Sequence, residues 1–203
     1  MDTLSILSTN GTIASISNNI TPVAAILERV KTNDLNQIPA NYLKINHFTQ
    51  VIWMCYSLKV WIIGLMAVNA FTSTLSCLNL FLYVIYSGQL VGFFPFYAMG
   101  LMSVVTVCMF VLSNEALGLV CIFLTLIASV STLESLQKTI GTGNYRFIDL
   151  KMGCSASFSN SVWTLFGVVA GDFNVMAASG FSMSLAFLLV LTHLYYRGVS
   201  KID

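Results

Sequence analysis

The sequence predicts an all-α integral membrane protein, a polytopic helical bundle of about six transmembrane helices. Residues 51–133 contain only two charged side chains, Lys59 and Glu115. Over the whole chain, 8% of the residues are charged and the mean hydropathy is +0.82, whereas soluble domains carry about 25% charged residues. Since a helical crossing needs about 20 apolar residues, residues 51–133 are long enough for about four crossings.

The composition also excludes several classes of function. A formal net charge of +1 argues against a nucleic-acid partner, because phosphate binding requires clustered lysine and arginine. No pattern typical of a catalytic nucleophile, a general base or a phosphate-binding loop is present, so we do not expect an enzyme. The cysteines form no CxxC pair, which argues against a metal site or a disulfide framework. They are Cys55, Cys77, Cys108, Cys121 and Cys154.

Residues 1–47 are predicted to form a polar tail that contains one short amphipathic helix. Residues 2–19 mix Ser, Thr, Asn and Gly with scattered apolar residues, which favours a weakly structured tail or a segment ordered by a partner. Thr21 and Pro22 suit the start of a helix. The apolar residues that follow have helical spacing, so this helix should lie on the membrane surface or fold back on the membrane domain.

Residues 48–133 are predicted to form a block of four membrane helices. Pro95 marks one boundary, because proline disrupts a helix and often lies at its end. A polar turn at residues 113–115 marks another. The expected helices span residues 48–70, 75–93, 96–112 and 116–133.

The rest of the chain is predicted to be a polar connector, residues 134–160, and a C-terminal membrane hairpin with a short basic end, residues 161–203. Residues 162–171 are apolar but short for a crossing, so this first arm is expected to be a tilted or re-entrant segment. Residues 175–196 are a clear crossing. The alternative to six crossings is a model with five, in which the first helix begins near Val60.

The distribution of charge favours six crossings with both termini on the cytoplasmic side. In that topology every basic side chain outside the membrane lies on one face, as the positive-inside rule requires. These residues are Arg29, Lys31, Lys44, Lys138, Arg146, Lys151, Arg197 and Lys201. Glu115 and Asp172 fall on the opposite face, where they could form an acidic mouth that attracts cations.

Lys59 is the one charge in the middle of a predicted crossing, which makes it a candidate partner site within the membrane. One account has Lys59 pairing with an acidic or carbonyl group inside protein, and this group could belong to a partner subunit. The other places the first helix lower, so that Lys59 only extends to the cytoplasmic surface. His47 and His193 would make a nearly solvent-exposed haem site, and we expect no cofactor.

Small residues predict close helix packing at two GxxxG motifs, Gly88 with Gly92 and Gly167 with Gly171. Small residues four apart allow helix backbones to approach each other within a membrane. There is also a short internal similarity between residues 66–71 and 176–181. Internal repeats build many transporters, but a match this short in apolar sequence is ordinarily a coincidence.

The function that we favour from sequence alone is a non-catalytic membrane subunit of a larger complex, in electron transfer, secretion or energy conversion. Ionisable residues are sparse in the predicted helices, whereas ion and proton pathways usually contain several. Its expected partners are the lipid bilayer and other membrane subunits, or further copies of the chain. The alternative is a small oligomeric ion channel or a solute transporter.

Overall fold

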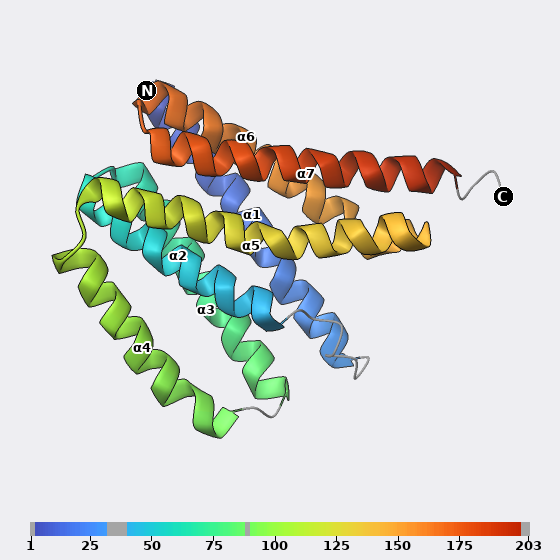
Figure 1. The fold of residues 1–203 in the computed structure, drawn as a ribbon, viewed down its shortest axis with the longest axis horizontal. Helices are drawn as coiled ribbons and strands as arrows, with labels where there is room; N and C mark the ends of the chain where they lie inside the picture. The colour runs from blue at the N-terminus through green and yellow to red at the C-terminus, as the bar shows by residue number, and fades with distance from the viewer. Residues whose placement is uncertain (1–2, 32–39, 88–89, 200–203) are drawn as a thin grey trace. The chain divides into compact units, whose positions relative to one another are not determined.

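The computed structural model describes residues 3–31, 40–87 and 90–199. These residues form an all-α fold of seven long helices and one short 3-10 helix (Figure 1), which confirms the predicted fold class. The elements are α1 (Thr3–Lys31), α2 (Ala40–Val60), α3 (Ile63–Ser87), α4 (Leu90–Phe110), α5 (Asn114–Thr142), η2 (Tyr145–Phe147), α6 (Leu150–Ala170) and α7 (Phe173–Val199).

The chain divides into two compact units. The first comprises Met1–Asn18 and Ile122–Asp203, and the second comprises Asn19–Cys121. The first therefore holds α6 and α7, which lie side by side, and the second holds the neighbouring helices α2 and α3 (Figure 1). Both α1 and α5 contribute residues to both units.

At the N-terminus the structure differs from the expected polar tail, because α1 runs from Thr3 to Lys31 and continues through Pro22. Its small polar residues are compatible with a helix because they bond to the turn before them. The hydroxyls of Thr9 and Thr12 donate to the carbonyl oxygens of Ser5 and Ser8, at 2.8 and 2.7 Å. Such bonds satisfy a hydroxyl without disrupting the helix.

The predicted crossing over residues 48–70 is wrong, because the chain turns in its middle. Helix α2 ends at Val60, and Trp61 adopts a left-handed conformation with φ of 57°. The amide of Trp61 donates to the carbonyl oxygen of Ser57 at 3.0 Å, an arrangement that closes a helix end. Lys59 consequently lies in the last turn of α2, at the end of a helix and not at the centre of a crossing.

The expected connector over residues 134–160 is largely helical in the structure. Helix α5 continues to Thr142, and α6 begins at Leu150. Asp149 fixes this start, because its Oδ1 accepts the backbone N–H groups of Lys151 and Met152 at 2.8 and 3.1 Å. Helix α6 therefore has 21 residues and is no shorter than an ordinary crossing. Similarly, α4 begins before Pro95, at Leu90.

The helices repeat along the chain with a period of 110 residues. Helix α2 spans Ala40–Val60 and α6 spans Leu150–Ala170, so both boundaries of α6 fall 110 residues later. Helices α3 and α7 begin at Ile63 and Phe173, with the same offset. The turns that precede them have positive φ at Trp61 and Gly171. The short similarity between residues 66–71 and 176–181 has this offset too, so it belongs to a true structural repeat.

The repeated unit contains three helices, and α4 comes between the two copies in the sequence. Helices α1 and α5, which open the two copies, each have 29 residues. The second helix of each copy contains an aromatic pair three residues apart in edge contact. The ring centroids are 5.6 Å apart in Trp53–Tyr56 and 5.2 Å apart in Trp163–Phe166. The order of elements is thus α1–α3, α4, α5–α7.

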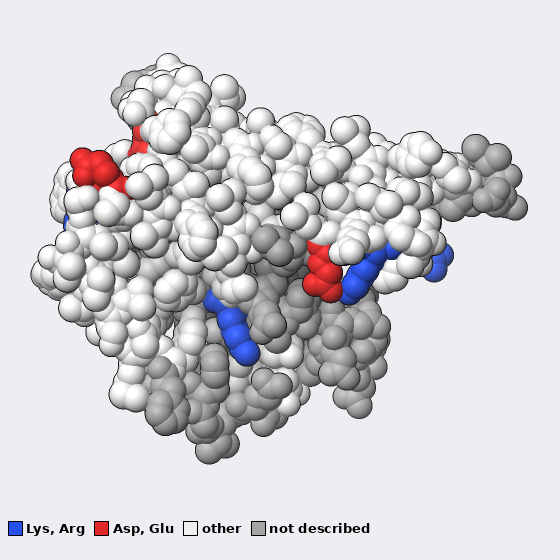
Figure 2. Space-filling model, viewed as in Figure 1, with Lys and Arg blue, Asp and Glu red and all other residues white. Residues whose placement is uncertain are grey.

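The surface of the described residues is that of a membrane protein. Three helices are long and apolar enough to cross a bilayer by themselves, α3, α5 and α7. Large apolar side chains such as Ile63, Met102 and Phe110 are 66–85% exposed. Charged side chains are few and scattered on the face that Figure 2 shows. Exposed apolar surface of this extent is typical of contact with lipid.

Candidate functional site

Helix α3 has a polar interior and an apolar exterior. Its buried side chains include Asn69, Thr72, Ser76 and Asn79, each at most 7% exposed. Phe71, Leu78, Phe81 and Ile85 on the same helix are at least 38% exposed. Polar residues within a membrane helix face protein or a water-filled cavity and are often functional.

Three hydrogen-bonded pairs connect this polar side of α3 to α2, and together we call them the polar ladder. The Asn69 side chain donates to the carbonyl oxygen of Trp53 at 3.1 Å. The hydroxyl of Thr72 donates to Gln50 Oε1 at 2.7 Å. His47 Nδ1 and the hydroxyl of Ser76 are 3.0 Å apart. The partners on α3 advance along the chain as those on α2 go back, as expected for antiparallel neighbours.

The polar ladder was not among the features predicted from the sequence. Its signal is present in the sequence, because Asn69, Thr72, Ser76 and Asn79 recur with helical spacing inside an apolar segment. In the predicted topology, Asn69 belongs to the crossing over residues 48–70, whereas Ser76 and Asn79 belong to the next crossing. Once the chain turns at Trp61, all four residues lie on one helix.

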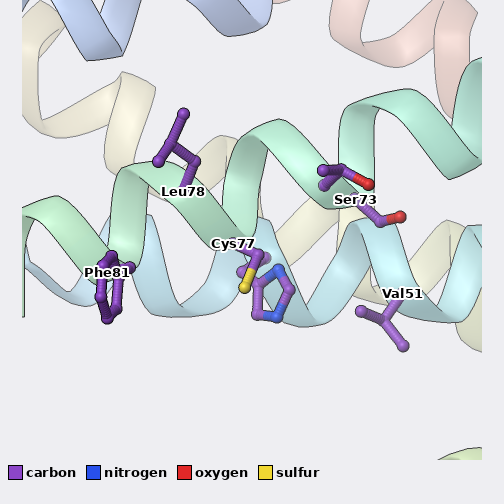
Figure 3. A pocket seen from close by; sticks show the side chains of 7 residues that line it. Val51, Ser73, Cys77, Leu78 and Phe81 are labelled. Carbon is purple, nitrogen blue, oxygen red and sulfur yellow. The ribbon is translucent and has the colours of Figure 1, made fainter.

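An open groove of about 490 Å³ lies on α2 and α3 beside the ladder (Figure 3). Its lining combines apolar side chains with hydroxyl, thiol and imidazole groups. The lining residues are His47, Val51, Ser73, Thr74, Cys77, Leu78 and Phe81. His47 therefore belongs both to the groove and to the polar ladder. Leu78 and Phe81 belong to the exposed apolar side of α3, so the groove opens on that side of the helix.

In the other unit, Trp163 of α6 lies against the N-terminal half of α1. Its indole Nε1 donates to the hydroxyl of Ser15 at 2.8 Å, and that hydroxyl lies 3.1 Å from the hydroxyl of Ser159. A Cβ atom added to Gly11 would come within 2.8 Å of the indole ring. Glycine is required there because the ring occupies the space of a side chain.

The predicted packing glycines have different roles in the structure. A Cβ atom added to Gly167 would lie 2.5 Å from the backbone nitrogen of Met176, so α6 and α7 touch backbone to backbone there. Gly171 has open space around it and a φ of 68°, and it closes the end of α6. Gly88 lies outside the described residues, and of its partner Gly92 the structure describes only the place in α4.

The amine of Lys59 lies at the C-terminal end of α4. Its Nζ donates to the carbonyl oxygen of Leu112 and lies 3.5 Å from the carbonyl oxygen of Cys108. Carbonyl groups at the end of a helix have no partner within the helix and carry partial negative charge. Lys59 thus meets carbonyl groups of its own chain.

We expect Lys59→Met to reduce stability without preventing membrane insertion. A cation at a partly buried helix C-terminus contributes about 1–2 kcal/mol, and methionine keeps much of the side-chain length but not the charge. The thermal unfolding midpoint of the purified protein in detergent should fall, and Lys59→Arg should restore most of it. Equal midpoints for Lys59→Met and the wild type would contradict this role.

Glu115 and Asp172 each lie at the beginning of a helix. Glu115 is exposed in the first turn of α5. Asp172 caps α7, because its Oδ1 accepts the backbone N–H groups of Asn174 and Val175 at 3.0 and 3.1 Å. Both positions are favourable for an acidic side chain, because the N-terminus of a helix is electropositive.

His193 is buried in α7, where its Nδ1 lies 2.8 Å from the carbonyl oxygen of Ile148. Its ring also makes an edge contact with Tyr145 of η2, with the centroids 5.1 Å apart. These contacts attach the segment that leads into α6 to the C-terminal part of α7. His193 and His47 belong to different units of the chain.

The chain is similar to known membrane transporters. Residues 115–201, less than half of the chain, match the MtN3_slv family, described as a sugar efflux transporter for intercellular exchange. These residues correspond to α5, α6 and α7. No curated protein sequence matches the chain. Among solved structures, a eukaryotic SWEET transporter is similar over 96% of this chain and 97% of its own, with a TM-score of 0.83 and 16% identity.

These similarities contradict our prediction of a non-catalytic subunit of a larger complex and favour its alternative, a solute transporter. The prediction used the sparseness of ionisable residues as evidence against transport. That argument applies to ions and protons, whereas a neutral solute can be bound by uncharged polar and apolar groups. The chain is similar in fold to a transporter that crosses the membrane several times, which is consistent with the predicted multi-pass membrane location.

Proposed function

We propose that this chain transports sugars or related polyhydroxylated solutes across a membrane. The match of α5–α7 to a sugar transporter family carries the proposal. The 110-residue repeat extends it to the first half of the chain, because both ends of α2 and the start of α3 lie 110 residues before those of α6 and α7. Two copies of one unit, repeated in the same direction, are also how the SWEET transporters are built.

The test is sugar counterflow with the purified full chain in liposomes. We expect saturable exchange of radiolabelled glucose or sucrose when the liposomes are loaded with the unlabelled sugar, and no ion current. Potassium or sodium conductance without sugar exchange would support the ion-channel alternative and contradict the proposal. Liposomes without protein give the background rate.

We expect Ser73→Phe to reduce sugar exchange at least about tenfold, which corresponds to 1.4 kcal/mol. Ser73 lines the groove on α3, and a phenyl ring would fill part of it. Ser103→Phe on α4 is the matched control, because both hydroxyls donate to a backbone carbonyl of their own helix, at 3.0 and 2.9 Å. Full exchange by Ser73→Phe would exclude the groove from the solute path.

The seven helices lead us to propose seven crossings, which revises the expected placement of both termini in the cytoplasm. An odd number of crossings puts the termini on opposite faces. With the C-terminus in the cytoplasm, the basic residues at the α5–α6 connection, Lys138, Arg146 and Lys151, are cytoplasmic as well. Glu115 and Asp172 then lie on the other face. This arrangement keeps the positive-inside pattern.

The topology can be tested with Cys154, which is exposed near the start of α6. In a variant that lacks the other cysteines, an impermeant maleimide applied outside intact cells should leave Cys154 unlabelled. It should react after the membrane is permeabilised. An N-terminal epitope tag should be accessible from outside. Rapid labelling of Cys154 in intact cells, or a cytoplasmic tag, would contradict seven crossings.

A further inference from the structure

The two copies of the repeat end their second helix with a similar backbone turn but with different residues. In the first copy the amide of Trp61 donates to the carbonyl oxygen of Ser57 at 3.0 Å, and the φ of Trp61 is 57°. In the second copy the residue 110 positions later is Gly171, which donates to the carbonyl oxygen of Gly167 and has a φ of 68°. Both residues are in the left-handed conformation, and only the side chain differs.

A tryptophan in this conformation costs the folded protein free energy that a glycine does not. A left-handed backbone brings the Cβ atom close to the following carbonyl oxygen, so glycine is the usual residue there and a bulky residue is an outlier. Trp61 is 71% exposed, so packing within its own unit covers only a small part of it. Unfavourable backbone conformations are concentrated where a protein binds something, and the exposed ring of Trp61 is what such a contact would use.

Other large apolar side chains are exposed on the two connections that Lys59 brings together. Its Nζ donates to the carbonyl oxygen of Leu112 and lies 3.5 Å from that of Cys108, so the turn between α2 and α3 is a neighbour of the end of α4. On these two connections, four apolar side chains are 71–85% exposed, and we call them the turn patch. They are Trp61, Ile63, Phe110 and Val111.

The turn patch lies where apolar surface is followed by polar surface. Helices α3 and α5 are both long and apolar enough to cross a bilayer, and they begin at Ile63 and Asn114, so each is expected to begin near a membrane surface. The next exposed residues after Val111 are the polar Ser113, Asn114 and Glu115. The turn patch is therefore continuous with the lipid-facing apolar surface on one side and with a polar turn on the other.

We propose that the turn patch inserts into the headgroup region of the bilayer and that the indole of Trp61 is its anchor. Tryptophan is enriched at membrane–water interfaces because its ring is apolar while its N–H donates a hydrogen bond. Ester carbonyl and phosphate oxygens of phospholipids are the acceptors there. Contact with lipid offsets the cost of the left-handed backbone and fixes the depth of the turn between α2 and α3. The proposal does not depend on sugar transport.

Depth-dependent fluorescence quenching tests this insertion. The chain has three tryptophans, so Trp53→Phe/Trp163→Phe leaves Trp61 as the only one. The full-length variant would be reconstituted in liposomes of phosphatidylcholine brominated either near the headgroup or near the chain end. We expect bromine near the headgroup to quench Trp61 at least twofold more than bromine near the chain end. Aqueous acrylamide should quench it at least twofold less than free tryptophan. The variant that also carries Trp61→Phe gives the background.

Three results would overturn the proposal. Quenching by acrylamide as strong as for free tryptophan would place Trp61 in water. Stronger quenching by bromine near the chain end would place it in the hydrocarbon core. Quenching by neither reagent would show that protein covers it, such as a second copy of the chain. If the double variant fails to fold, a nitroxide on Trp61→Cys, in a background without native cysteines, decides between the same depths by its accessibility to oxygen and to a water-soluble nickel chelate.

The cost of the left-handed backbone has a test of its own, because alanine keeps the Cβ atom that glycine lacks. Both Trp61→Gly and Trp61→Ala remove the indole. In detergent we expect the thermal unfolding midpoint of Trp61→Gly to be higher than that of Trp61→Ala, since a Cβ atom at positive φ destabilises the fold by more than the entropy it removes from the unfolded chain. An equal or lower midpoint for Trp61→Gly would overturn the argument that the tryptophan is retained at a cost.

Discussion

The Gly167→Leu variant is expected to yield little folded protein. Gly167 meets the backbone of α7, where even a Cβ atom would lie 2.5 Å from the nitrogen of Met176. A leucine side chain must push α6 and α7 apart along their contact, because neither backbone can move aside locally. Overpacking typically costs about 1–3 kcal/mol in cores that can adjust, and we expect the upper end of that range or more here.

The measurement is the yield and the thermal unfolding midpoint of detergent-solubilised protein on size-exclusion chromatography. Gly180→Ala is the control on the facing helix, since its added Cβ would lie 3.7 Å from Thr164, an ordinary contact distance. That variant should behave as the wild type or slightly better, because alanine favours the helix. A Gly167→Leu protein with wild-type yield and midpoint would refute the close contact.

The second large effect is expected for Trp163→Ala. Trp163 is 7% exposed, contacts Gly11, and donates its indole N–H to Ser15. Its removal leaves a cavity between α1 and α6. We expect the free energy of unfolding to fall by about 3 kcal/mol, the low end for large aromatic truncations. The cavity still costs free energy, but the transfer of the side chain out of water contributes less, because lipid is the solvent around the helices.

Trp163→Phe separates the cavity from the hydrogen bond. Phenylalanine fills most of the space but cannot donate, so this variant should lose about 1 kcal/mol, the net value of one hydrogen bond. Both values come from unfolding midpoints measured in the same detergent. If Trp163→Ala and Trp163→Phe are equally destabilised, then the hydrogen bond, and not the packing, is what Trp163 contributes.

The sequence predicted the fold class because charge and apolar content are properties of whole segments. Residues 51–133 could not have a water-facing surface whichever way their helices are divided. The GxxxG spacing likewise singled out Gly167, and the backbone of Met176 lies against it. These inferences depend only on which residue types are present and on local spacing.

Besides the turn at Trp61, what could not be predicted from the sequence has one physical origin, the small polar residue inside a bundle. Ser15 and Ser159 lie in segments that we read as a tail and a connector, yet they are buried against each other. Serine and threonine are typical of loops in water, but in a membrane bundle they allow helices to approach and hydrogen-bond across the contact. Only the tertiary partner distinguishes the two cases, and it lies more than one hundred residues away in sequence.

Helix α4 has a consequence for how such a chain is inserted during synthesis. In the seven-crossing arrangement that we propose, three crossings deliver the chain to the opposite side of the bilayer, so a second three-helix copy attached directly to the first would enter in the opposite orientation. One additional crossing corrects the parity, and both copies then have the same direction. A deletion of α4 would therefore lead to one of two outcomes during membrane insertion. Either Lys138, Arg146 and Lys151 are exported against the charge rule, or the second copy inserts incompletely.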